Sequence, residues 1–168
     1  MNYKGTTYKQ ATVSDVREVI QLVQKYRFQE DGSGFLLPVT VEELIGRTTA
    51  GNLYVATHKD RVVGTFSLVE YDGLVELRSV AVEGQYEGHG IGTALVKMSV
   101  QEAQSRGYSK LITFARKDSK AQKLYLGEGF VPTEKPPEKL KKDCEACFLH
   151  HAGLCNEQAM IRELFVSS

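Results

Sequence analysis

The chain has 168 residues, with 21 basic and 21 acidic side chains and therefore no formal net charge at pH 7. This balance excludes a protein held on nucleic acid or anionic lipid by its overall electrostatic field, and the length suits one domain with its own core. No run of about 18 or more apolar residues is present, and the amino end is too polar for a signal peptide. We expect one domain over residues 1–168, cytoplasmic, acting on a small molecule, with neither nucleic acid nor membrane as partner.

The first third of the chain predicts one strand and two helices. Tyr8–Ala11 is the strand. Thr12 and Asp15 resemble a capping box at the start of a helix, and Thr40 and Glu43 form a full capping box at the start of a shorter one. The first helix carries its apolar residues at helical spacing: Val16, Val19, Ile20 and Val23.

The middle of the chain predicts an antiparallel meander. Three segments, Leu53–Thr57, Val62–Glu70 and Leu74–Val82, are rich in β-branched and aromatic residues and are separated by turn residues. Asp72 and Gly73 predict a two-residue hairpin turn, in which we expect both residues to have positive φ.

The second half of the chain alternates helices with strands, which predicts a parallel pair joined by a helical crossover. The helix after a glycine-rich turn carries two neighbouring apolar stripes and closes at Gly107, and a further helix begins at Asp118 or Ser119. An irregular segment, Glu134–Asn156, holds all three cysteines. Three more strands are expected: Leu111–Ala115, Phe130–Thr133 and Gln158–Phe165.

These elements predict the α/β (α+β) class. We expect a mixed, mostly antiparallel sheet of about seven strands, flanked by about four helices, with the irregular cysteine-containing insertion before the last strand.

The glycine-rich turn predicts an anion site. Gly88, Gly90 and Gly92 lie where a strand gives way to a helix, so backbone N–H groups of the first helical turn can face a phosphate. A P-loop is excluded because no Gly-Lys-Ser/Thr triplet follows, and Thr93 stands where a dinucleotide fingerprint needs its third glycine. The turn therefore fits neither of these nucleotide-binding motifs.

The turn resembles a different motif. Gln85, two free positions, Gly88, one free position and Gly90 resemble the acetyl-CoA loop of the GNAT acetyltransferase superfamily. Residues 118–130 resemble the family's later motif, which usually opens with Asn where this chain has Asp118. The resemblance covers about residues 8–130 and implies the GNAT fold, with acetyl-CoA as cosubstrate and a primary amine as acceptor.

The resemblance also implies which residues hold acetyl-CoA. The loop would bind the pyrophosphate, and the pantetheine arm would lie along the fourth strand. Glu87 stands where the family commonly has a basic residue, so we expect its side chain to point to solvent. The implied cofactor-binding residues are Val80, Ala81, Val82, Gln85, Glu87, Gly88, His89, Gly90, Ile91, Gly92, Thr93 and Ser119.

Two residues match catalytic positions of the family. Glu76 would be the base that takes a proton from the amine, the alternative being an ordinary solvent-facing strand glutamate. Tyr125 would be the acid that protonates the departing thiolate, the alternative being a core aromatic residue. Strand N–H groups near Val80 would meet the oxyanion.

The acceptor is the least determined part. Leu37-Pro38 and residues 76–82 resemble stand-alone N-acetylglutamate synthase-like members, which favours the α-amine of an amino acid such as glutamate, contacted by Leu37 and Arg78. Val39 stands where that group commonly has an arginine. A protein amino terminus, a polyamine, an antibiotic, or a non-catalytic CoA-sensing or interaction module are the alternatives. Family members often form homodimers, so a homodimer is open here too.

The cysteines allow a zinc site without requiring one. Three thiolates and one imidazole could bind the metal, whereas reduced, packed cysteines without metal are the default expectation. The residues concerned are Cys144, Cys147 and Cys155 with His150 or His151.

Overall fold

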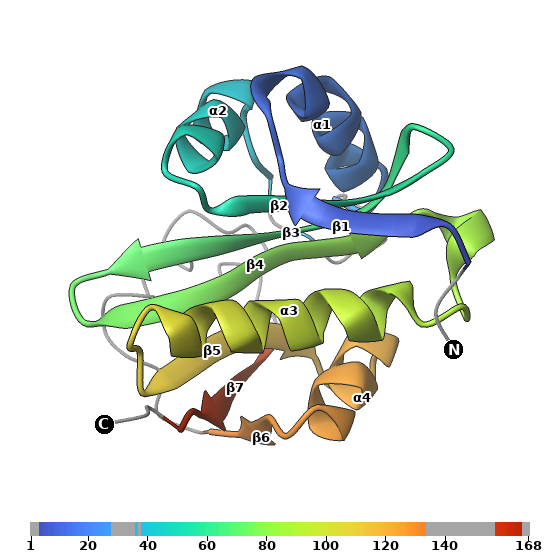
Figure 1. Ribbon diagram of the computed structural model, residues 1–168. Helices are drawn as coiled ribbons and strands as arrows, with labels where there is room; N and C mark the ends of the chain where they lie inside the picture. Colours follow the sequence, from blue (N-terminus) through green and yellow to red (C-terminus); the bar gives the residue numbers. More distant parts are fainter. Residues whose placement is uncertain (1–3, 28–35, 37, 134–156, 166–168) are drawn as a thin grey trace.

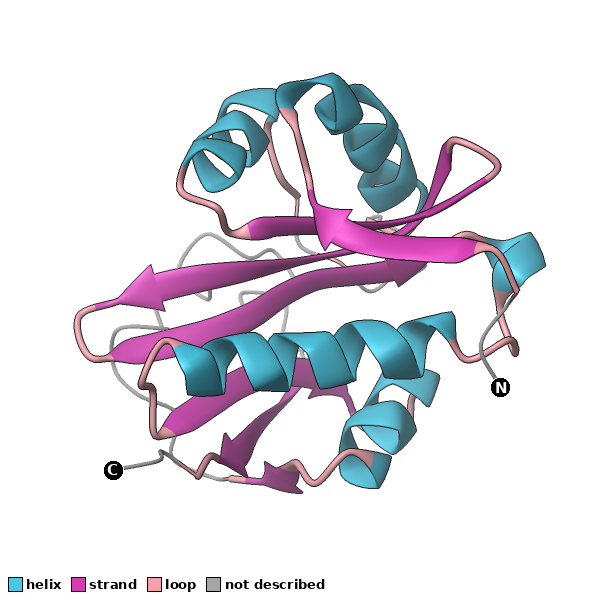
Figure 2. Cartoon of the chain, viewed as in Figure 1, coloured by secondary structure: helices cyan, strands magenta, loops and turns pink. Residues whose placement is uncertain are grey.

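The computed structural model describes residues 4–27, 36, 38–133 and 157–165, whose elements are drawn in Figures 1 and 2. None of the helices in this part of the chain is long and apolar enough to span a membrane. In chain order the elements are β1 (Thr6–Gln10), η1 (Val13–Asp15), α1 (Val16–Lys25), α2 (Val41–Thr49), β2 (Leu53–His58), β3 (Arg61–Tyr71), β4 (Leu74–Val82), η2 (Gly84–Tyr86), α3 (Ile91–Ser105), β5 (Lys110–Arg116), α4 (Lys120–Gly127), β6 (Val131–Pro132) and β7 (Glu157–Glu163), where η marks a 3-10 turn.

The strands form one seven-stranded sheet in the order β1-β2-β3-β4-β5-β7-β6. Neighbouring strands are antiparallel except for β4 and β5, which are parallel and are connected through α3. The mixed, mostly antiparallel sheet with four helices is therefore confirmed, as is the parallel pair. The cysteine-containing insertion falls in residues 134–156, outside the described residues.

The helices cover the two faces of the sheet in pairs, with α1 and α2 on one face and α3 and α4 on the other (Figure 1). The core beneath α3 and α4 includes Phe66, Leu77 and Leu95. The core beneath α1 and α2 includes Val19 and Leu44. Because helices cover both faces of the central strands, polar side chains such as Ser67 of β3 and Glu76 of β4 are buried.

The side-chain caps expected from the sequence are present. The Thr12 N–H donates to Asp15 Oδ2 over 2.8 Å, and Thr40 Oγ1 accepts from the Glu43 N–H over 3.1 Å. Ser119, the second of the two residues considered for the last cap, accepts from the N–H three positions on. The caps at Thr40 and Ser119 satisfy donors that the first turns of α2 and α4 leave unpaired, whereas the Thr12 box precedes the 3-10 turn that leads into α1.

The predicted hairpin between β3 and β4 is confirmed by the register pair Tyr71 and Leu74. Gly73 has φ 76°, but Asp72 does not have positive φ, so the expectation for both turn residues is wrong. The turn between β2 and β3, at residues 59–60, has φ of 51° and 61° and is the one in which both residues are left-handed. A two-residue turn can therefore join these strands with only its second residue left-handed.

Strand β4 contains a bulge. Ser79 and Val80 lie opposite the single residue Phe66, and Ser79 has φ 54°. Since strand side chains alternate between faces, one extra residue reverses the alternation. Before the bulge Leu77 packs in the core beneath α3, and after it Ala81 packs in the core beneath α1 and α2.

Candidate active site

The sheet opens between its two parallel strands. β4 and β5 are paired in register only at Val75 with Leu111 and at Glu76 with Ile112. The Thr113 hydroxyl then donates to the carbonyl of residue 77 over 3.0 Å. Beyond this point, within the described residues, β4 pairs with β3 alone. The edge of β4 that faces β5 therefore offers backbone N–H and C=O groups to an extended ligand.

The glycine turn lies at the end of this open edge. Gly88 and Gly90 have φ of 80° and 84°, a conformation that other residues rarely adopt. The first bond of the α3 ladder runs from the Ala94 N–H to the Gly90 carbonyl over 3.0 Å, so the amides of Ile91 to Thr93 precede the ladder. These amides form the helix N-terminus expected to hold an anion. Gly92 serves a different purpose, since a Cβ there would lie 3.4 Å from a Leu124 methyl group of α4.

Glu87 and Ser119 flank the turn. The Glu87 side chain is 49% exposed, in agreement with the expectation that it faces solvent, and its carboxylate lies 3.8 Å from Lys120 Nζ. Ser119 Oγ accepts from the Gln122 N–H over 3.1 Å as the cap of α4. A role for Ser119 in binding the cofactor therefore has to be compatible with this capping bond.

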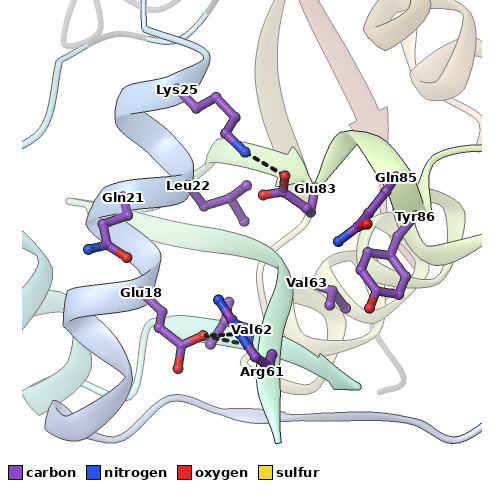
Figure 3. Close-up of a pocket in the computed structure, with 10 residues that line it drawn as sticks. All are labelled: Glu18, Gln21, Leu22, Lys25, Arg61, Val62, Val63, Glu83, Gln85 and Tyr86. Carbon is purple, nitrogen blue, oxygen red and sulfur yellow. Dashed lines mark hydrogen bonds and ion pairs between the residues drawn. The ribbon is translucent and has the colours of Figure 1, made fainter. Parts of the chain in front are cut away.

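A cavity of about 420 Å³ lies between α1 and the segment that enters the glycine turn, and Gln85 and Tyr86 line it (Figure 3). Lys25 donates to Glu83 across one end of it. Glu18 accepts from the backbone N–H of residue 62 at the other end, over 2.9 Å. The charged groups around this cavity are thus engaged with protein partners.

Glu76 is buried on the face of β4 that carries α1 and α2 (Figure 1), with 4% of the residue exposed. The Tyr71 hydroxyl donates to its Oε1 over 3.0 Å, and Arg78 Nε lies 3.7 Å from its Oε2. The alternative of an ordinary solvent-facing glutamate is therefore wrong. A buried carboxylate held by a phenol and beside a guanidinium is a group that can exchange a proton away from bulk water.

Tyr125 is buried in the opposite core, with 4% exposed, and packs against Phe130 with ring centroids 5.4 Å apart. Burial raises the pKa of the Tyr125 hydroxyl to about 12, the Thr113 side chain acts against this rise, and the charges of Glu157 and Glu76 add to it. The hydroxyl is therefore protonated at neutral pH, as a proton donor must be. The position fits the core-aromatic reading equally, because a packed ring would be buried in the same way.

Sequence reasoning missed two charged residues of this region. Arg47, on α2, donates to Ser67 Oγ over 3.1 Å and to Ser79 Oγ over 3.4 Å. Glu157, the first residue of β7, lies opposite Arg116 of β5, and burial raises its pKa to about 7 although the charge of Arg116 acts to lower it. Arg47 follows Glu43 at helical spacing, which indicates an ordinary surface ion pair, so its position in the sequence gave no signal of burial.

Leu37 and the five residues of the possible zinc site lie outside the described residues. His89 lies in the glycine turn, and Ile91 and Thr93 lie in the first turn of α3. Within the part of the chain that is described, no group of three or more His, Cys, Asp or Glu side chains could hold a metal ion.

Residues 17–130, more than half of the chain, match the acetyltransferase (GNAT) family. Over 160 residues the chain is 26% identical to an uncharacterised N-acetyltransferase of Chlorobaculum tepidum, which covers 95% of this chain and 97% of that protein. It is 32% identical over 112 residues to N-acetyltransferase 8B of Rattus norvegicus, which covers 66% of this chain and 45% of the rat protein.

Solved structures share the fold. The Rv2747 protein of Mycobacterium tuberculosis, in complex with CoA and NLQ, aligns with a TM-score of 0.78 and 23% identity over 95% of this chain and 99% of that chain. The N-acetylglutamate synthase of Neisseria gonorrhoeae, complexed with CoA and N-acetyl-glutamate, aligns with a TM-score of 0.78 and 20% identity. That alignment covers 98% of this chain but 36% of the synthase, so the chain spans about a third of that protein.

Proposed function

The chain belongs to the acetyltransferase (GNAT) family and is an acetyl-CoA-dependent N-acetyltransferase, and from this premise we propose that its acceptor is the α-amine of an amino acid. One observation carries the proposal: a buried carboxylate and a guanidinium lie side by side, with Glu76 Oε2 and Arg78 Nε 3.7 Å apart. A free amino acid carries the complementary pair, an ammonium and a carboxylate separated by one carbon atom. Arg78 suits the carboxylate, because a guanidinium binds it through two parallel hydrogen bonds.

In the proposed reaction Glu76 is the base. The amine must be neutral to attack, so its ammonium form gives a proton to the Glu76 carboxylate. The nitrogen then attacks the thioester carbon, and the carbonyl oxygen gains negative charge that the Val80 N–H would stabilise. When the carbon–sulfur bond breaks, the thiolate takes a proton from Tyr125 and leaves as CoA. The nitrogen gives up its second proton as the amide forms, and this proton restores the Tyr125 hydroxyl through solvent, while Glu76 releases the first proton to water. The products are the N-acetylated amino acid and the free thiol.

The open edge of β4 supports the proposed placement of the cosubstrate. Val80 to Val82 lie on the part of β4 that pairs with β3 alone, so an extended pantetheine arm can add to this edge as a further strand. The arm would end at the glycine turn, where amides of the helix N-terminus meet the pyrophosphate. Each N–H bond to a charged oxygen contributes about 1.5–3 kcal/mol. The helix dipole adds about 0.3–1 kcal/mol, so the amides dominate.

Glutamate is one candidate within this class. The gonococcal synthase with the same fold is complexed with N-acetyl-glutamate, which supports an acidic amino acid as acceptor. Leu37 would contact the acceptor from the segment before α2. Val39, standing where synthase-like proteins commonly have an arginine, is the residue that separates this chain from that pattern.

The experiment measures thiol release from acetyl-CoA with purified protein and a panel of acceptors: amino acids including glutamate, a polyamine, an aminoglycoside and peptides with a free amino terminus. Amino acids should be the best acceptors. The Glu76→Gln variant should lower turnover by about a hundredfold at low pH, with a smaller loss at high pH, where more of the amine is already neutral.

The pH profile tests the role of Glu76 as base separately from the class of acceptor. A Glu76→Gln variant with an unchanged pH–rate profile would remove Glu76 from the role of base while leaving the acceptor class intact. Selective acetylation of the polyamine, the aminoglycoside or the peptides would instead overturn the acceptor class. Glu42→Gln, on the exposed side of α2, is a control for a lost carboxylate and should retain the wild-type profile.

A further inference from the structure

We propose that Arg47 of α2 binds the carboxylate of the acceptor together with Arg78 of β4, so that the two guanidiniums select a free amino acid over its carboxamide. The proposal rests on the proposed function and adds to it a residue from a second element, and a reason for rejecting amines without an adjacent carboxylate.

Arg47 lies next to the candidate site. Its side chain is 11% exposed, and its NH1 group donates to Ser67 Oγ of β3 and to Ser79 Oγ at the β4 bulge. Ser67 is the register partner of Arg78, so the two arginines reach the same face of β3 and β4 from different elements. Arg78 is 16% exposed and lies beside Glu76. Two guanidiniums and the proposed base are therefore gathered beneath α2.

The hydrogen bonds of Arg47 leave room for a ligand. Both go to neutral hydroxyl groups, and both come from the same nitrogen, NH1. The carboxylate nearest to it among the described residues, Glu43 Oε2, lies 3.7 Å from NH2, beyond hydrogen-bond length, on a side chain that is 52% exposed. A buried guanidinium usually pairs with a carboxylate through direct bonds, and Arg47 makes no such bond within the described part of the chain.

The electrostatics of the pair favour an anion. Burial lowers the pKa of Arg47, and the positive charge of Arg78 lowers it further, while Glu43, Glu76 and Tyr71 act in the opposite direction. Two cations held near each other under a helix repel, and a carboxylate placed between them would remove that repulsion. The same carboxylate would bring the α-amine to Glu76, since one carbon atom separates the two groups of an amino acid.

The test compares each acid with its own α-carboxamide: L-glutamate with isoglutamine, and L-methionine with L-methioninamide. The wild-type protein should prefer the acids by about a hundredfold in kcat/KM, because the carboxamide cannot place a negative charge between the two guanidiniums. Arg47→Met should raise KM for the acids by about tenfold or more, leave the carboxamides unchanged, and so reduce the preference. Arg47→Lys should restore part of it, since lysine retains the charge but loses the planar fork.

The matched control is Arg17→Met, which removes an exposed arginine from α1 and should leave both ratios at wild-type values. If amino acids are acetylated but acids and carboxamides react equally well, Arg47 is not a carboxylate ligand although the proposed function stands. If no amino acid is acetylated and another amine is, the proposed function fails and this proposal fails with it. Thermal unfolding shows whether Arg47→Met is folded. If it is not, the acid-to-carboxamide ratio of kcat/KM in the wild type and in Arg47→Lys tests whether Arg47 binds the carboxylate.

Discussion

Two partly buried arginines lie on opposite faces of the sheet, and they are held in different ways. Arg106, at the end of α3, donates to the carboxylates of Glu70 and Glu102, to Asn52 Oδ1, and to two further oxygens at 2.9 and 3.0 Å. Arg47, beneath α2, donates to two serine hydroxyls. Each nitrogen of the Arg106 guanidinium donates to a carboxylate or a carbonyl oxygen, whereas the hydrogen bonds of Arg47 go to hydroxyl groups.

The comparison indicates that Arg106 stabilises the fold, whereas Arg47 keeps donors that a ligand could bind. A guanidinium whose donors are all satisfied has nothing left to offer a substrate, but its removal leaves several buried oxygens unpaired. A guanidinium bound only to hydroxyls contributes less to folding and retains donors for an anion. We therefore expect changes on the α3 face to alter stability, and changes on the α2 face or at the β4–β5 opening to alter chemistry or pH response.

The largest effect is expected from Arg106→Met. This variant should lose about 3 kcal/mol in free energy of unfolding, because Asn52 and Glu70 lose a charged partner. Urea unfolding measures the loss, and Arg47→Met, changing by less than about 1 kcal/mol, is the matched comparison. Acetylation by the Arg106 variant should be normal well below its unfolding midpoint. Equal losses of stability in the two variants would remove the distinction between the arginines.

A second, smaller effect is expected on the pH dependence of the free energy of unfolding, through the Glu157 carboxyl. Its folded-state pKa of about 7 lies above the ordinary value of 4.5, so between these values the folded protein binds a proton that the unfolded chain has released. This contribution to stability is fully present below pH 4.5 and is lost as the pH rises through 7. Glu157→Gln should therefore match the wild type near pH 4 and exceed it by about 2 kcal/mol at pH 8. Denaturant titrations at the two pH values measure this, and an equal difference at both would contradict the assignment.

The smallest effect is expected from Tyr125→Phe, at the opening between β4 and β5. Loss of the hydroxyl should reduce turnover by about tenfold, while affinity for CoA and the unfolding midpoint remain near wild type because the ring still packs against Phe130. Steady-state kinetics and CoA binding by calorimetry separate these quantities. Tyr108→Phe, which removes a hydroxyl bonded to Glu70 on the α3 face, is the control and should retain full turnover. A Tyr125→Phe variant of full activity would leave Tyr125 as a packing residue.

Local patterns predicted most of the fold. Apolar periodicity and capping residues carry information about their own segment, so the meander, the hairpin pairing of Tyr71 with Leu74, and the caps at Thr12 and Thr40 were predictable. Strand ends differed by one or two residues, as for β1, predicted at 8–11 and found at Thr6–Gln10. Pairing with a neighbouring strand sets such ends, and no local pattern reports it.

The burial of charged residues was not predictable in the same way. Nothing in the sequence around Arg47 distinguishes it from the exposed arginine at position 17, because its contacts with Ser67 and Ser79 come from the packing of α2 on the sheet, which no local pattern reports. The bulge at Ser79 was also missed, since a serine with positive φ has no distinctive sequence context. Without the bulge, Glu76 and Val82 would face the same side of the sheet, being an even number of residues apart. The role of Leu37 and of the cysteines stays a prediction.

The bulge at Ser79 divides β4 into two stretches whose side chains point to different faces of the sheet. The stretch before it, with Glu76 and Arg78, turns these polar side chains toward α2, whereas the stretch after it turns Val80 and Val82 toward the core beneath α3. If Glu76 and Arg78 contact the acceptor as proposed, substitutions in the first stretch can change the preferred acceptor without disturbing the second, which leads into the glycine turn. One irregular residue in the strand would then separate the residues proposed to select the acceptor from those proposed to hold acetyl-CoA.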